Sequence, residues 1–384
     1  MMEGKNIIAF SKEWEADWTS NHHILTVLAR KNRVLWINSI GMRSPAIAQA
    51  KDWQRMIKKI FQGVKGIRKK KKNLYLLTPL VWPFEKPHFL RRWSFRLLTI
   101  QIRIFIWRMR MRPFQLWTFL PSAEYFVGRL GEEFSVYYCT DDWRNFPHIG
   151  GEKLASQERK LLKRVNCVFA TSRYLKSQKE RVNKHVYLIT HGVGKIFQKK
   201  GKMEAPEDMK MIPRPILGFC GWLCDRVDKD LLFQLALSCP NCSLVLIGKE
   251  TGDFWKLKTL PNVYFLGQKP YVQLPGYLSL FNVALIPYQM LPELMAATNP
   301  IKLKEYLALG IPVVTTDLTE AYQYHDACWI ARTDEEFIRC VKEALEPSGK
   351  VRGKKGKEMV AKETWESKVE YLSQIIETEM KRQG

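Results

Sequence analysis

Short apolar runs alternate with amphipathic stretches along most of the chain. In the first half we predict strands at 7–11, 34–38, 74–79, 115–120, 135–140, 167–172 and 186–190, with a helix at 22–30. In the second half we predict strands at 216–222, 243–248, 263–267, 283–288, 312–316 and 328–331, and helices near 228–238, 271–281, 300–309 and 334–346. Strands that alternate with helices are typical of parallel sheets, so the pattern predicts an α/β fold with two Rossmann-like domains.

A charged segment that contains prolines, residues 199–214, separates the two series of strands. A chain of 384 residues is too long for one ordinary core and suits two domains. We therefore predict an N-terminal domain over 1–198, a linker over 199–214 and a C-terminal domain over 215–362.

Residues 299 to 316 carry the clearest local signals. Asn299 suits the N-cap of a helix and Pro300 suits the first helical position. An apolar stripe follows at helical spacing, formed by Leu303, Tyr306 and Leu307. Gly310 suits the left-handed position after a helix, and Ile311 to Thr316 suits a buried strand. The stretch predicts a helix, a tight turn and a parallel strand.

The start of this helix can hold an anion. Unpaired N–H groups and the helix dipole favour a diphosphate there, and Lys302 adds a full positive charge. Glu305 follows on the same side, where its carboxylate can accept hydrogen bonds from sugar or ribose hydroxyls. The alternative is a surface helix on which Lys302 and Glu305 pair with each other.

The same stretch resembles a known family motif. The matching positions are Pro300, Lys302, Glu305, Tyr306, Leu307, Ala308, Gly310, Pro312, Val313 and Val314. The motif is similar to the nucleotide-sugar-binding helix of the family-4 (group 1) glycosyltransferases of GT-B fold, especially the teichuronic-acid and exopolysaccharide branch. That family often has a second glutamate eight residues before the first, where this chain has Ala297.

Residues Gly218 to Leu232 resemble the first donor-domain loop of that family. The resemblance implies that Gly221 lets the backbone approach the diphosphate and that Arg226 pairs with it. Relatives carry an arginine close after the glycine, whereas Trp222 follows it here. The alternative for Arg226 is a surface ion pair with Asp225 or Asp228. The donor-binding residues expected in this way are Gly221, Arg226, Gly267, Asn299, Lys302 and Glu305.

The first half resembles the acceptor domain of the same branch. The similar segments are Leu116–Pro121, Tyr137–Trp143, Val168–Ser172 and His191–Val193. Asp141 and Asp142 follow a predicted strand, at the sheet edge where ligands bind in open α/β folds. We expect Asp142, or failing it Asp141, to act on the acceptor hydroxyl. The alternative is an N-cap aspartate beside a solvated one. His22 and His23 could also contact the acceptor, or be capping or solvent-facing residues.

Positive charge is concentrated in the first half. The net charge is +24, and residues 1–200 hold 39 Lys and Arg against 14 Asp and Glu. Within them, residues 51–112 hold 18 basic and 2 acidic side chains. Two segments, 51–72 and 89–111, mix these charges with apolar residues at helical spacing. Neither suits a membrane span, but both suit an anionic membrane surface. The alternative is that the apolar stripes pack on the domain's own sheet.

The cysteines indicate a reducing compartment. Most of the eight lie in apolar patterns, and we expect a cytoplasmic protein without a signal peptide. Cys239 and Cys242 have the spacing of half a metal site, but a second pair is missing, so we predict no metal.

The resemblance implies a metal-independent glycosyltransferase with GT-B architecture, whose parallel sheets face an interdomain cleft and whose terminal helix, within 363–384, crosses back onto the first domain. Its donor would be a nucleotide sugar such as a UDP- or GDP-sugar, acting as substrate rather than cofactor. Its acceptor would be a glycan or lipid-linked sugar at the inner face of the cell membrane, in cell-surface polysaccharide or glycolipid synthesis. Two alternatives are a basic nucleic-acid-binding protein and a GT-B nucleotide-sugar epimerase.

Overall fold

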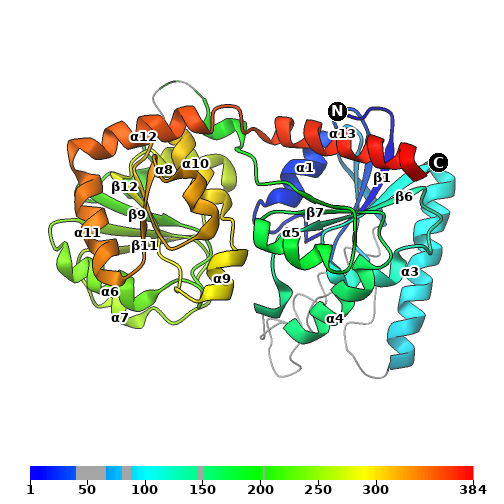
Figure 1. The fold of residues 1–384 in the computed structure, drawn as a ribbon, viewed down its shortest axis with the longest axis horizontal. Helices are drawn as coiled ribbons and strands as arrows, with labels where there is room; N and C mark the ends of the chain where they lie inside the picture. Colours follow the sequence, from blue (N-terminus) through cyan, green and yellow to red (C-terminus); the bar gives the residue numbers. More distant parts are fainter. Residues whose placement is uncertain (40–65, 80–87, 146–149, 200, 202–203, 384) are drawn as a thin grey trace. The chain divides into compact units, whose positions relative to one another are not determined.

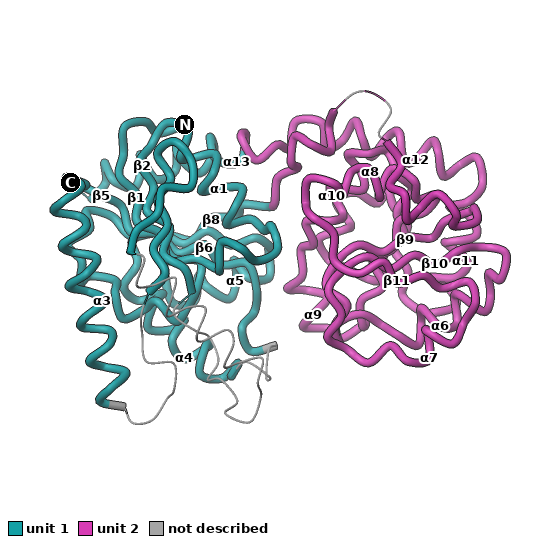
Figure 2. Tube along the Cα trace, turned by 180° about the vertical axis from the view of Figure 1, so that it is seen from behind, with its two compact units in different colours: residues 1–190, 368–384 teal, residues 191–367 magenta. Residues whose placement is uncertain are grey.

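The computed structural model describes residues 1–383 except 40–65, 80–87, 146–149, 200 and 202–203 (Figure 1). The chain forms two compact units (Figure 2). Unit 1 comprises residues 1–190 and 368–384, and unit 2 comprises residues 191–367.

Unit 1 is built on an eight-stranded sheet with the order β3-β4-β2-β1-β5-β6-β7-β8. The strands are β1 (Asn6–Phe10), β2 (Arg33–Ile37), β3 (Ile67–Lys71), β4 (Leu74–Leu77), β5 (Phe114–Thr118), β6 (Phe134–Cys139), β7 (Cys167–Ala170) and β8 (Val186–Leu188). The helices are α1 (Ser20–Leu28), α3 (His88–Arg108), α4 (Gly151–Leu162), α5 (Arg173–Glu180) and α13 (Trp365–Gln383). In Figure 1, α1 and α13 lie on one side of the sheet, and α4 and α5 on the other. The central strands β5 and β6 are buried along their whole length and mostly apolar, because both faces of the sheet are covered.

Strand β3 departs from the prediction of an amphipathic segment at 51–72. Residues 67–71 form an edge strand antiparallel to β4, with Asn73 at a φ of 63° in the tight turn between them. Lysines are common on edge strands, since their charges discourage pairing with a second chain. The earlier part of the predicted segment, 51–65, lies outside the described residues.

Unit 2 has a six-stranded, wholly parallel sheet with the order β11-β10-β9-β12-β13-β14. Its strands are β9 (Ile216–Cys220), β10 (Ser243–Ile247), β11 (Val263–Gly267), β12 (Val283–Ile286), β13 (Val313–Thr316) and β14 (Cys328–Ala331). Its helices are α6 (Lys229–Ser238), α7 (Trp255–Lys258), α8 (Leu274–Leu278), α9 (Pro292–Ala297), α10 (Ile301–Leu309), α11 (Asp334–Leu345) and α12 (Pro347–Met359). The order reverses between β9 and β12, and in such sheets ligands bind beyond the carboxyl ends of the strands at that switch point.

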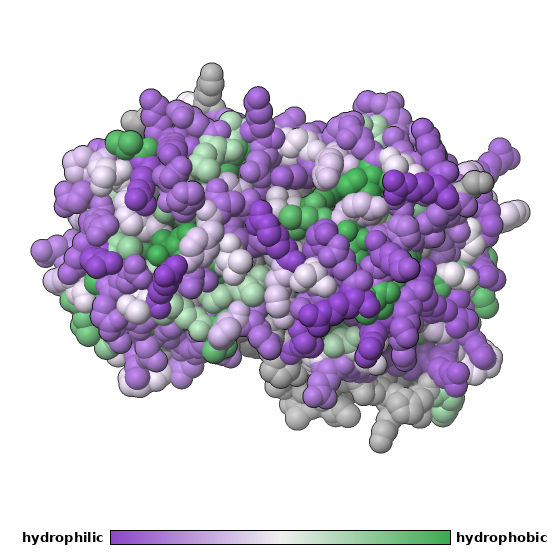
Figure 3. All heavy atoms as spheres, viewed as in Figure 1, coloured by the Kyte–Doolittle hydropathy of each residue, from purple (hydrophilic) through white to green (hydrophobic). Residues whose placement is uncertain are grey.

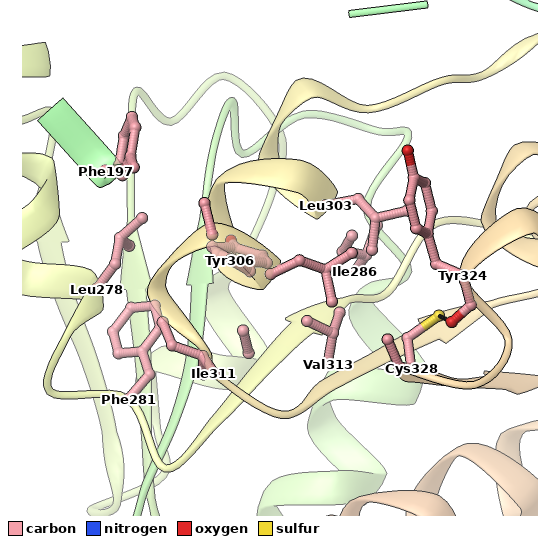
Figure 4. Close-up of a cluster of buried hydrophobic side chains, with 14 of the residues drawn as sticks. Phe197, Leu278, Phe281, Ile286, Leu303, Tyr306, Ile311, Val313, Tyr324 and Cys328 are labelled. Carbon is pink, nitrogen blue, oxygen red and sulfur yellow. Dashed lines mark hydrogen bonds between the residues drawn. The ribbon is translucent and has the colours of Figure 1, made fainter. Parts of the chain in front are cut away.

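A hydrophobic core lies on each side of the unit 2 sheet. One core joins the sheet to α8 and α10, and Figure 4 shows part of it, with Leu303 and Tyr306 of α10 among Ile286 and Val313 of the sheet. The other core joins the sheet to α6 and α11. These two layers fix the strand ends and the start of α10 in place.

The boundary between the units differs from the predicted linker at 199–214. Met209 and Ile212 are buried in the core of unit 2, and Asp208 accepts hydrogen bonds from Lys269 at 2.6 Å and Tyr277 at 2.9 Å. These contacts make the later part of the predicted linker an integral part of unit 2. At the other end of the chain, the part of α13 from residue 368 onward belongs to unit 1.

Candidate functional site

Helix α10 begins beyond the carboxyl end of the unit 2 sheet. Its N-cap position is Pro300, so the helix starts one residue later than predicted and Asn299, which is buried, precedes the cap. It ends at Gly310, whose φ of 76° lies in the left-handed region expected there. The Tyr306 hydroxyl accepts a hydrogen bond from the Cys220 backbone at 2.8 Å, which ties the helix to the end of β9.

Lys302 lies against the loop that follows β9. Its ammonium is 4.0 Å from the centroid of the Phe219 ring and 5.1 Å from that of Tyr288. A Cβ atom placed on Gly221 would lie 2.1 Å from the Lys302 Nζ. The glycine therefore leaves room for the ammonium beside the backbone at the switch point between β9 and β12.

Arg226 reaches the same place from the loop that precedes α6. Its guanidinium donates to the Thr298 hydroxyl at 3.0 Å and lies 5.8 Å from the centroid of the Tyr288 ring. The alternative partners are otherwise engaged, since Asp225 pairs with Lys229 and Asp228 caps α6. Arg226 and Lys302 thus share one aromatic neighbour, and their charges make this strand end attractive to an anion.

Glu305 is buried one turn into α10, where 7% of its surface is exposed. The Tyr271 hydroxyl donates to its Oε1 atom at 3.4 Å. Burial raises the pKa of Glu305 to about 7, although the Tyr271 hydrogen bond and the charge of Lys302 oppose this rise. The two residues are therefore not merely partners in a surface ion pair. Lys302 lies against the Phe219 ring, and Glu305 accepts a hydrogen bond from Tyr271.

Three glycines bring the ends of β9, β10 and β11 together. The Gly248 N–H donates to the Gly267 carbonyl at 2.9 Å, and Gly267 has a φ of 68°. A Cβ atom on Gly248 would lie 1.8 Å from the Gly221 carbonyl oxygen, so this position requires glycine. Sequence reasoning identified Gly221 and Gly267 but missed Gly248, whose signal was its place as the last residue of the strand predicted over 243–248.

Asp142 follows β6 in unit 1 and is held in an ion pair. Both carboxylate oxygens accept from the Arg144 guanidinium, at 3.0 and 2.6 Å, and the Arg144 backbone N–H also donates to the carboxylate at 3.2 Å. Burial would raise the pKa of Asp142, but the hydrogen bonds and charge of Arg144 outweigh it, so the pKa lies below its ordinary value. A carboxylate stabilised in this way is a weaker base than a free one.

Asp141 is the more exposed member of the pair. It is half-buried, whereas Asp142 is buried, and its Oδ2 atom accepts from the Thr140 hydroxyl at 2.8 Å. In the same unit, the Glu158 carboxylate accepts hydrogen bonds from the Lys179 ammonium and the Tyr137 hydroxyl, both at 2.7 Å. This buried cluster stabilises the end of β6, which the two aspartates follow.

His22 takes part in capping the start of α1. It is buried, its Nδ1 atom faces the Thr19 N–H at 3.2 Å, and its Nε2 atom lies 3.1 Å from the Trp14 carbonyl. Burial lowers the pKa of His22 to about 4, so the ring is neutral near pH 7. Both ring nitrogens hold the loop before α1, which leaves neither for an acceptor. His23 is also buried.

The Cys239 and Cys242 pair forms part of a turn. The Cys242 N–H donates to the Cys239 carbonyl at 3.0 Å, and both thiols are reduced and buried. Within the described part of the chain, no group of three or more His, Cys, Asp or Glu side chains is arranged to hold a metal ion.

Comparisons with known proteins agree with this architecture. Residues 214–346 match the family model described as Glycosyl transferases group 1. A Bacillus subtilis (strain 168) protein named as a teichuronic acid biosynthesis glycosyltransferase, TuaH, is 27% identical over 222 residues, which cover 53% of this chain and 55% of that protein. The aligned region thus spans about half of the relative's length.

Two solved structures share the whole fold. Sucrose-phosphate synthase from Thermosynechococcus elongatus superposes with a TM-score of 0.72 at 16% identity, covering 97% of this chain and 98% of the other. Anabaena HepE, solved in complex with UDP and glucose, has a TM-score of 0.68 at 11% identity, covering 96% and 98%. The predicted GT-B type of fold, with two parallel-sheet α/β domains, is confirmed, and residues 214–346 match the group 1 glycosyl transferase model.

Proposed function

We propose that the chain, whose residues 214–346 match the group 1 glycosyl transferase model, is a glycosyltransferase that moves a sugar from a nucleotide-sugar donor to a glycan or lipid-linked acceptor. The observation that carries the proposal is the meeting of Lys302 and Arg226 at the switch point of the unit 2 sheet, around Tyr288. HepE, which shares the fold, binds UDP and glucose, and this supports a UDP-sugar as donor. A GDP-sugar is the second candidate.

The donor diphosphate would sit at the start of α10. The unpaired N–H groups of its first turn, the Lys302 ammonium and the Arg226 guanidinium would neutralise the charge that develops as the nucleoside diphosphate leaves. Gly221 would let the backbone approach the phosphates closely. Because two fixed cations supply this charge, we expect donor binding without a metal cofactor.

Glu305 would bind hydroxyl groups of the donor. Its carboxylate lies one turn beyond Lys302 on α10, a spacing that suits a ribose or sugar next to the diphosphate. Tyr271 would orient that carboxylate. Gly248 and Gly267, whose backbones meet at neighbouring strand ends, would accommodate the base.

The acceptor would bind to unit 1 near the end of β6. Asp141 or Asp142 would take the proton of the attacking hydroxyl in an inverting reaction, and would only position the acceptor in a retaining one. The accessible Asp141 suits the first role, and the Asp142–Arg144 pair suits the second.

The site of action would be the cytoplasmic face of the cell membrane, in cell-surface polysaccharide or glycolipid synthesis. The name of TuaH supports a polysaccharide role, and the 18 basic against 2 acidic residues within 51–112 support contact with anionic lipid. Within the part of the chain that the structure describes, no helix is long and apolar enough to cross a membrane.

A nucleotide panel tests the proposal. We expect UDP or GDP to raise the melting temperature and the matching nucleotide sugar to be consumed only when an acceptor is added. Turnover without acceptor would instead indicate the epimerase. Tight, salt-dependent binding of nucleic acid without any affinity for nucleotide sugars would indicate the nucleic-acid-binding alternative.

A further inference from the structure

Helix α3 carries a hydrophobic stripe on its exposed face. Six of its large apolar side chains have between 50% and 79% of their surface exposed: Phe89, Trp93, Leu97, Ile100, Ile104 and Trp107. Successive members are three or four residues apart, so they line one face of the helix. We call this set the outer stripe. On the face of the molecule drawn in Figure 3, hydrophilic residues predominate and hydrophobic ones form patches among them.

The opposite face of α3 accounts for its packing in unit 1. That face consists of Phe95, Leu98, Ile102, Phe105 and Ile106, all buried. Phe95 lies against Phe126 with ring centroids 5.4 Å apart, and Phe105 lies 6.4 Å from Tyr75 of β4. The residues of unit 1 that the structure describes therefore leave the outer stripe exposed, and it is available for a partner.

Arginines border the outer stripe on both sides. Helical spacing puts Arg92, Arg96 and Arg103 along one edge and Arg108 along the other. The helix has five arginines and neither Asp nor Glu. Apolar side chains flanked only by cations match an anionic lipid surface, where the chains enter the acyl region and the guanidinium groups meet phosphates. A second copy of the helix would bring like charges together, which disfavours a dimer through this face.

We infer that the outer stripe of α3 inserts into the surface of an anionic membrane, with the helix lying in the membrane plane. This deepens the membrane part of the proposed function and does not depend on the identity of the donor. Two of the three lysines of β3 are less available for this purpose. Lys70 pairs with Glu15 at 3.0 Å, and Lys71 lies within 6.0 Å of the ring centroids of Trp14 and Trp18.

Vesicle co-sedimentation tests the inference on the full chain. The probe is vesicles of phosphatidylglycerol and phosphatidylcholine, and the variant combines Trp93→Gln, Ile100→Gln and Trp107→Gln. A matched control combines Leu237→Gln, Trp255→Gln and Val351→Gln, which are apolar positions of unit 2 with more than half of their surface exposed, as in the α3 set. We expect the α3 variant to lose at least about tenfold in vesicle affinity, and the control to bind as the original chain does.

Two further measurements keep the outcome clear. Melting temperature and UDP affinity should be equal in both variants, so a loss of vesicle binding is not a loss of fold or of donor binding. Undiminished vesicle binding by the α3 variant, or an original chain that does not bind the vesicles, would overturn the inference while leaving the proposed donor site intact. A dimer that only the α3 variant loses, detected by sedimentation velocity, would assign the outer stripe to a second copy and overturn it equally.

Discussion

The Lys302 ammonium lies 4.0 Å from the centroid of the Phe219 ring, so a cation–π contact joins the first turn of α10 to the end of β9. This contact holds the charge in place before any ligand arrives. A preorganised cation costs less to use than a flexible one, because its side chain is already ordered.

Replacing Lys302 by Ala should weaken binding of the nucleoside diphosphate by about 1.5 to 3 kcal/mol, the range for a hydrogen bond to a charged group. Isothermal titration with UDP and GDP measures the change. Lys256→Ala removes an exposed lysine of α7 and is the matched control. Equal affinities in the two variants would show that Lys302 does not contact the diphosphate.

Gly248→Ala should disrupt the donor site through the backbone. The new Cβ atom would lie 1.8 Å from the Gly221 carbonyl oxygen, so the loop after β9 must move. We expect nucleotide affinity and melting temperature to fall together. Gly128→Ala is the control for backbone strain alone, since Gly128 has a φ of 76° and its Cβ would meet nothing within 4 Å. Normal nucleotide binding by Gly248→Ala would mean that this close approach is not needed for the site.

Much of the fold could be predicted from short-range signals in the sequence. The segment 299–316 was predictable because its start, its left-handed glycine and its strand are each encoded within a few residues. The helix starts one position later than predicted, and the strand begins at Val313 instead of Ile311. The parallel strands were predictable for the same reason, since buried strands are short apolar runs.

Contacts between distant segments were not predictable. Residues 67–71 form a strand because they pair with β4, and their lysine-rich sequence does not predict this pairing. Met209 and Ile212 sit in a charged, proline-bearing segment, yet they are buried against unit 2. The contacts of Tyr271 with Glu305 and of Arg226 with Thr298 join residues far apart in sequence, so the sequence identified the charged members but not their partners.

Nucleotide-sugar affinity should depend on pH through Glu305. Its pKa of about 7 means that the carboxylate becomes protonated as the pH falls from about 8 to about 6, and a protonated group accepts hydroxyl hydrogen bonds poorly. Affinity should therefore fall over this range. Glu305→Gln should remove the dependence. Tyr271→Phe deletes a hydrogen bond that lowers this pKa, so it should move the fall to higher pH. Identical pH profiles in all three proteins would remove Glu305 from the donor site.

The same group should affect stability in the opposite sense. The pKa of Glu305 is higher in the folded chain than its ordinary value of 4.5, so the folded state binds more protons between these two values. The stabilising contribution of the protonated form is complete below the ordinary value and is lost as the pH rises through about 7. Melting curves of the ligand-free protein should show Glu305→Gln gaining stability relative to the original chain as the pH rises. A difference that stays constant with pH would contradict this.

The two aspartates after β6 should have separable effects. Asp142 is buried and bound to Arg144, whereas Asp141 is half-buried and accepts a hydrogen bond from the Thr140 hydroxyl. If either is the catalytic base, its Asn variant should lower turnover by about a hundredfold or more and leave nucleotide affinity unchanged.

If Asp142 only positions the strand end, Asp142→Asn and Arg144→Gln should each lower the melting temperature, and the double variant should lose little more than either single one. Arg144→Gln adds a second test, because removing its hydrogen bonds should raise the pKa of Asp142 and shift the acid limb of the pH–rate profile upward only if Asp142 is the base. Near-normal turnover in Asp141→Asn and in Asp142→Asn would exclude both from the reaction.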